Sequence, residues 1–188
     1  MRYQFVLLFA VLGLLQGCGV AAGVVSGVGA GMATSDRRSA GTMIEDDTIE
    51  SKAHKRIEEK YKDTAHVSIT AYNRFALITG TAASEAAKMD IERIVGGIPN
   101  VKGIANELVV STVASSGSTS SNSRITGNVK SRFAKSTAFK PDHVRVVTEN
   151  GVVYLLGLVT HAEADAASDI ASTTNGVQKV VRVFEYID

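Results

Sequence analysis

The chain has 188 residues, 45% of them hydrophobic and 21% charged, and its formal net charge is +1 at pH 7. Because the net charge is so small, the electrostatic field of the whole chain cannot attract a charged partner. We therefore expect no nucleic-acid partner and look instead for a local charged patch. A single cysteine, Cys18, excludes an intramolecular disulfide.

The first 17 residues have the layout of a secretory signal. Arg2 provides a positive start, and an apolar run from residue 5 to residue 15 follows. That run is too short to span a bilayer as a permanent helix, which needs roughly 20 apolar residues. Residues 15–18, Leu-Gln-Gly-Cys, are similar to a bacterial lipobox. We therefore expect Cys18 to be acylated and to become the mature N-terminus, and Gly19 after it is typical of sorting to the outer membrane.

Residues 18–44 are predicted to be a flexible tether that begins at the acylated cysteine. Between residues 19 and 33 the chain is made almost only of Gly, Ala, Val and Ser, which cannot bury a core. Gly27, Gly29 and Gly31 superficially resemble a nucleotide-binding loop, but they neither follow a strand nor open a helix at the required spacing. Residues 36–42 are polar, and we expect them to be ordered only where they dock.

The first predicted domain covers residues 45–113 in the order α-β-β-α-β. Its first helix carries apolar residues at four-residue spacing, from Ile49 to Tyr61, which is typical of a helix facing a core. Strands are predicted over 67–71 and 75–79, and a second helix over 84–95, with Ser84 as its cap. A last strand over 103–111 is expected to lie parallel to its predecessor after a crossover connection.

A Ser-rich segment, residues 114–122, is predicted to be a linker to a second domain, residues 123–188. This domain repeats the order of elements: a helix over 124–135, strands over 144–148 and 152–156, a helix over 162–172 and a strand over 180–187. Its hairpin turn is predicted at residues 149–151, because Asn-Gly is a strong signal for a tight hairpin.

The two domains are copies of one another. Ile49, Ala53 and Ile57 recur 76 residues later as apolar residues of the second domain's first helix, and the strand pairs recur at an offset of 77. A repeat of this length indicates two units of one architecture. The predicted fold class is α+β, with a three-stranded mixed sheet packed against two helices in each unit. Differences between the copies are therefore the place to look for function.

The repeated unit resembles the BON domain. The resemblance is carried in the second copy by residues 144–146, 150–152, 155–157, 166–167 and 176–180, and in the first by residues 67–69, 77–80 and 101–104. With the lipobox and tether, the whole chain resembles the dual-BON-domain outer-membrane lipoproteins. That resemblance implies a periplasm-facing lipoprotein that supports envelope integrity, binds anionic phospholipid through its second domain, gathers at the division site and works near the outer-membrane protein assembly machinery.

The copies differ most in charge. Residues 45–63 contain seven acids and five bases, a balance of −2, whereas residues 123–145 contain six bases and one acid, a balance of +5. At about 100° per residue, one side of the second copy's first helix is buried and the other side is polar. The predicted phospholipid-binding residues on it are Arg124, Gly127, Asn128, Ser131, Arg132 and Lys135. An ordinary solvated helix face is the alternative. Arg124 stands where the resemblance leads us to expect a tryptophan.

Three other functions compete with phospholipid binding. An enzyme is disfavoured because His54, His66, His143 and His161 have neither metal-ligand spacing nor a paired nucleophile. We therefore expect no catalytic residue, no metal and no cofactor beyond the covalent lipid on Cys18. Residues 161–165 are interpreted as a helix cap. A docking adaptor acting mainly through the first domain, and a purely structural pair of domains that pack on each other, both remain open.

Overall fold

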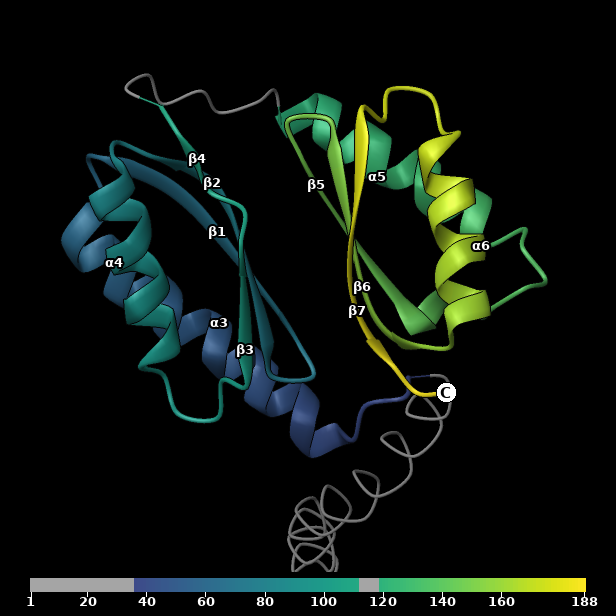
Figure 1. Ribbon diagram of the computed structural model, residues 1–188, viewed down its shortest axis with the longest axis horizontal. Coiled ribbons are helices and arrows are strands. Elements are labelled where there is room, and N and C mark those ends of the chain that lie inside the picture. Colours follow the sequence, from purple (N-terminus) through teal and green to yellow (C-terminus); the bar gives the residue numbers. More distant parts are fainter. Residues whose placement is uncertain (1–35, 112–118) are drawn as a thin grey trace, which may run out of the picture. The chain divides into compact units, whose positions relative to one another are not determined.

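The computed structural model describes residues 36–111 and 119–188 (Figure 1). Cys18 and the predicted tether up to residue 35 lie outside these residues, so their predictions stand as predictions. Within the two described ranges, no helix combines the length and the apolar character needed to cross a membrane.

The first copy contains α3 (Ala40–Tyr61), β1 (Ala65–Tyr72), β2 (Phe75–Ala82), α4 (Glu85–Gly96), β3 (Gly103–Asn106) and β4 (Val109–Val110). Strand β2 is antiparallel to β1 and parallel to both β3 and β4. Helix α3 begins earlier than predicted because Ser39 caps it by accepting a hydrogen bond from the Thr42 amide. The predicted last strand is broken in two, since the Asn106 side chain accepts from the Leu108 amide and Leu108 turns into the core.

The second copy contains α5 (Thr119–Phe133), the 3-10 turn η1 (Pro141–His143), β5 (Val144–Glu149), β6 (Val152–Val159), α6 (His161–Ser172) and β7 (Lys179–Tyr186). Strand β6 is antiparallel to β5 and parallel to β7. The α+β class and the mixed sheets are thus confirmed. Helix α5 begins inside the segment 114–122 that was predicted to be a linker, and its first turn is attached to the second copy through Asn122, whose side chain accepts from the Gly151 amide.

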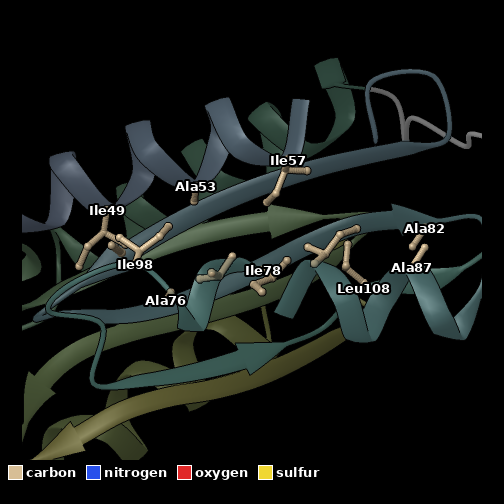
Figure 2. Close-up of a cluster of buried hydrophobic side chains, with 12 residues drawn as sticks. Ile49, Ala53, Ile57, Ala76, Ile78, Ala82, Ala87, Ile98 and Leu108 are labelled. Atoms are coloured by element: carbon tan, nitrogen blue, oxygen red, sulfur yellow. The ribbon is translucent and has the colours of Figure 1, made fainter. Parts of the chain in front are cut away.

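In each copy both helices cover the same face of the sheet (Figure 1). Figure 2 shows the core of the first copy, where Ile49, Ala53 and Ile57 of α3 point toward Ala76 and Ile78 of β2. The predicted apolar stripe is therefore confirmed. In the second copy the equivalent positions of α5 are filled by Ile125, Val129 and Phe133, all buried.

The two copies pack on each other through the sheet faces that the helices leave bare. Tyr72 and Leu77 of the first sheet form one buried cluster with Tyr154 and Leu156 of the second. Beside this cluster, Arg145 of β5 donates to the Ala71 carbonyl oxygen at 3.3 Å and lies 3.2 Å from a Glu50 carboxylate oxygen. Arg145 is one of the six bases of residues 123–145, and in the structure it belongs to the contact between the copies.

Both hairpins are tight turns in which the two central residues have positive φ. In the first copy these are Asn73 (φ 51) and Arg74 (φ 68). Arginine is unfavourable in this conformation, and Asp46 of α3 offsets the cost. Its carboxylate accepts from the Asn73 amide at 2.9 Å and from the Arg74 amide at 2.6 Å. Asp46 is one of the seven acids of residues 45–63, but it adds no charge to the surface, since its exposed fraction is 1%.

The same helix-to-turn connection recurs in the second copy. Asn122, which lies 76 residues after Asp46, accepts a hydrogen bond from the amide of Gly151 at 3.4 Å. The turn here is Asn150-Gly151, and both residues again have positive φ. Glycine adopts this conformation without strain, so the turn of the second copy depends less on its helix than the turn of the first.

Replacing Asp46 by alanine should lower the free energy of unfolding by about 3 to 5 kcal/mol, because two backbone donors and the Arg38 guanidinium lose a buried acceptor. Urea denaturation of the Asp46→Ala variant measures this. Asp47→Ala is the matched control, since Asp47 is the exposed neighbour, and it should change the free energy by less than about 0.5 kcal/mol. Equal effects of the two substitutions would contradict this role for Asp46.

Candidate functional site

The six residues predicted to bind phospholipid are all exposed, and five of them lie on α5. The six are Arg124, Gly127, Asn128, Ser131, Arg132 and Lys135. The sixth, Lys135, lies in the turn after α5, because the helix that was predicted to reach residue 135 ends at Phe133. The opposite side of the helix is buried through Ile125, Val129 and Phe133. The structure therefore brings five of the predicted residues to the solvent side of one helix, as the helical spacing required, and places Lys135 just beyond the end of that helix.

Arg132 differs from the other five because it is bound to α6. Its Nη1 donates to the Ile170 carbonyl oxygen and to Thr174 Oγ1, both at 2.7 Å, and its Nη2 donates to Thr173 Oγ1 at 2.9 Å. A cation at this end of a helix also favours the helix dipole. The first copy has the same contact, since Arg56 Nη1 donates to the Gly97 carbonyl oxygen at the end of α4 at 3.3 Å. Arg132 thus serves the scaffold that both copies share.

Arg124 and Lys135 carry the charge that is left on the outward face. Neither side chain makes a hydrogen bond or an ion pair with any residue in the described ranges 36–111 and 119–188. Their equivalents 76 residues earlier are Thr48 and Glu59. These two charges belong to the second copy alone, so the scaffold does not require them.

Gly127 has open space beside it. A Cβ atom built on this residue would meet no atom within 4 Å. Packing therefore does not require a glycine at this position of the helix, although glycine weakens a helix by up to about 1 kcal/mol relative to alanine.

Residues 36–38, named here the clasp, attach the start of the described chain to both copies. Arg37 Nη1 donates to the Leu158 carbonyl oxygen at 2.7 Å, and the Arg37 guanidinium holds both carboxylate oxygens of Glu163, at 2.6 and 2.9 Å. Arg38 lies 4.0 Å above the centre of the Tyr72 ring and donates to Asp46 at 2.9 Å. Sequence reasoning missed the clasp, because the two arginines follow no pattern that marks them as buried partners.

Glu163 also caps α6. The Thr160 side chain accepts from the Glu163 amide, and the Glu163 carboxylate accepts from the Thr160 amide, so the capping role predicted for this segment is confirmed at Glu163. The other two polar residues there are also bound: His161 Nδ1 lies 2.7 Å from Asp188, and Arg182 donates to Asp165 at 2.7 Å. In the described part of the chain no group of three histidine, cysteine or acidic residues could hold a metal ion.

The contact between Arg37 and Glu163 should make stability depend on acid pH. The hydrogen bond from Arg37 lowers the pKa of Glu163 from 4.5 to about 2, with burial opposing this change. The stabilisation is therefore present above pH 4.5 and is lost as the pH falls toward 2. Between these pH values the free energy of unfolding of the native chain should fall by on the order of 1 to 2 kcal/mol more than that of Glu163→Gln, as measured by urea denaturation at each pH. If the free energies of unfolding of both proteins fall equally with pH, this role of Glu163 is contradicted.

Gly127→Ala should stabilise the protein by up to about 1 kcal/mol, because the added methyl group meets open space and alanine favours the helix. Thermal unfolding measures the change. Gly80→Ala is the opposite control: Gly80 has φ +113, and its Cβ would lie 1.9 Å from the His66 carbonyl oxygen, so that variant should be strongly destabilised. A destabilised Gly127→Ala protein would show that this position of α5 has no free space for a methyl group.

Comparison with known proteins shows that residues 45–112 and 121–188 each match the family model of the BON domain. The chain is 38% identical to the outer membrane lipoprotein DolP of Haemophilus influenzae over 176 residues, which cover 93% of this chain and 91% of that protein. It is 33% identical to a 21 kDa hemolysin of Actinobacillus pleuropneumoniae, covering 81% of this chain and 79% of the relative. The chain is 25% identical to the osmotically-inducible protein Y of Escherichia coli, covering 78% of this chain and 75% of the relative.

Proposed function

Since the chain belongs to the BON-domain family, and within it to the outer-membrane lipoproteins of the DolP type, we propose that it binds anionic phospholipid through α5 and has no enzymatic activity. In this proposal an acyl group on Cys18 holds the protein in the outer membrane on the periplasmic side. There it supports the integrity of the membrane, at the division site.

Two unpaired charges, one on α5 and one in the turn after it, carry this proposal. Arg124 and Lys135 are exposed, have no partner in the described residues, and replace the uncharged Thr48 and the acidic Glu59 of the first copy. Near an anionic membrane each such charge contributes about 1 kcal/mol. Two or three charges alone give only weak binding, so the helix needs a second means of attachment.

The acyl anchor on Cys18 would supply this second attachment. Eighteen residues lead from Cys18 to the clasp at Asp36, and a chain of this length reaches at most about 60 Å. An anchor within that distance gives α5 a high effective concentration at the lipid surface, so weak contacts suffice. The clasp connects both copies to this anchored segment, because Arg38 binds the first copy and Arg37 binds the second.

Reversing the two charges should abolish most lipid binding. The chain from residue 18 onward, with Cys18→Ser so that no acyl group contributes, is sedimented with phosphatidylglycerol vesicles. Arg124→Glu with Lys135→Glu should lower the affinity at least tenfold, because four units of charge change near the surface. Binding of the unaltered face should also weaken as salt is added.

The matched control makes the same charge change on the first copy. Lys52→Glu with Lys55→Glu alters two exposed lysines of α3 at the positions equivalent to Asn128 and Ser131, and should leave the affinity within about twofold. Equal losses in both double variants would indicate a response to net charge alone. Unchanged binding of the folded α5 variant would refute the proposed function. Arg132 is left out of the test, because its loss would disturb α6.

A docking adaptor is the second candidate, and one observation favours it. Four large apolar side chains of the first copy are exposed: Ile44 (67%), Met89 (64%), Val109 (57%) and Val110 (38%). Exposed apolar groups of this size are typical of protein contacts when they cluster. In this proposal the first copy would bind components of the outer-membrane protein assembly machinery, and lipid contact would be secondary.

Crosslinking in cells separates the two candidates. A photo-reactive residue at Ile44 or Met89 should capture a protein if the adaptor function holds, whereas one at Lys135 should capture lipid if the lipid function holds. Protein adducts from the first copy, with no lipid adduct at Lys135, would favour the adaptor.

A further inference from the structure

A polar groove lies beside α5, between the two copies. Its volume is 530 Å³, and it is lined by residues of α5, β1 and β5. His66 and Ser68 of β1 provide the wall from the first copy, and Gly127 and Lys130 of α5 provide the opposite wall. Thr126 donates a hydrogen bond to Thr148 at 2.7 Å across its base. The groove is therefore built by both copies.

The groups that line the groove are available to a ligand. The side chains of Ser68 and Lys130 are exposed and make no hydrogen bond or ion pair within residues 36–111 and 119–188. Glu149 lies at the end of β5, where burial raises the pKa of its carboxyl group and attraction to His66 opposes the rise. The groove thus presents a fixed positive charge on Lys130 and a carboxylate acceptor on Glu149.

This combination of groups selects a particular ligand chemistry. Lys130 and His66 suit a phosphate, whereas Glu149 would repel a bare phosphate and suits a hydrogen-bond donor beside it. A phosphodiester that ends in a hydroxyl or ammonium group satisfies both. Gly127 belongs both to this groove and to the exposed face of α5, and the space beside it is open. A headgroup can therefore pass from the lipid-facing side of the helix into the groove.

We propose that this groove binds a phospholipid headgroup whose phosphate carries a terminal hydrogen-bond donor, with His66 and Ser68 of the first copy forming one side of the site. The inference rests on the proposed function and extends it from one helix to both copies. Phosphatidylglycerol and phosphatidylethanolamine have this chemistry. Phosphatidylcholine does not offer it, because its terminal nitrogen is fully methylated, and inorganic phosphate has no donor group set beyond the phosphate itself.

Binding to neutral vesicles that differ only in the lipid headgroup tests whether the site requires a hydrogen-bond donor. The chain from residue 18 with Cys18→Ser is titrated with phosphatidylcholine vesicles, and with the same vesicles containing 30 mol% of phosphatidylethanolamine or phosphatidylglycerol. Both phosphatidylcholine and phosphatidylethanolamine are neutral overall, so a face that acts only by charge binds them equally. The groove predicts at least threefold tighter binding when phosphatidylethanolamine is present, and Glu149→Gln should remove that difference.

Substitutions in the first copy test the second wall. His66→Glu and Ser68→Glu should each lower the affinity for phosphatidylglycerol vesicles at least threefold, although both residues lie outside α5. His54→Glu is the matched control, because His54 is an exposed histidine of the same copy that does not line the groove. It should bind within 1.5-fold of the unaltered chain. Circular dichroism checks that each variant is folded.

The outcomes separate this inference from the proposed function. Normal binding by both His66→Glu and Ser68→Glu, or equal binding of the two neutral vesicles by the unaltered chain, overturns the groove while the role of Arg124 and Lys135 stands. Displacement of vesicles by inorganic phosphate, beyond that caused by chloride of equal ionic strength, also overturns it, since the site would then need nothing beyond the phosphate. If the folded variant with Arg124→Glu and Lys135→Glu binds phosphatidylglycerol vesicles as tightly as the unaltered chain, the proposed function itself is overturned.

Discussion

Each copy covers one face of its sheet with two helices and leaves the other face bare. That bare face carries Leu77 in the first copy and Leu156 in the second, and such side chains stabilise the fold only when they leave water. The two copies meet this constraint together, by burying the bare faces in one shared cluster. Within residues 36–111 and 119–188 neither sheet has another covering layer on that side, so each copy buries this face against the other.

This shared cluster decides what the other elements can do. With the sheets turned toward each other, α3 to α6 remain on the faces away from the cluster. Arg124 of α5 and Lys135 in the turn after α5 are then free to meet a surface. The same contact brings β1 beside α5 and so forms the groove with His66 and Lys130. The clasp spans the contact, because Arg37 binds Glu163 and Arg38 stacks on Tyr72. A lipid contact on one copy is thereby coupled physically to the other.

The periodic features of the fold could be predicted from the sequence, because apolar spacing and Asn-Gly turns act over a few residues. The stripe from Ile49 to Ile57 and the parallel last strands are examples. Contacts between distant charged residues left no such signal. Asp46 looks like one of several surface acids, and only the fold brings the backbone of the turn at Asn73 against its carboxylate. Arg132 and Arg145 likewise look like free charges until α6 and Glu50 are in place.

The repeat itself separates scaffold from function once the contacts are known. Where both copies use a position in the same way, the position serves the scaffold, as Asp46 and Asn122 do at the hairpins and Arg56 and Arg132 do at the helix ends. Where a charge appears in one copy and has no partner in the described residues, the scaffold cannot account for it. Arg124 and Lys135 pass this criterion and Arg132 does not. The basic face of α5 is therefore smaller than its sequence implies. Under the proposed function, a site with so few charges would draw on the additional groups of the neighbouring groove.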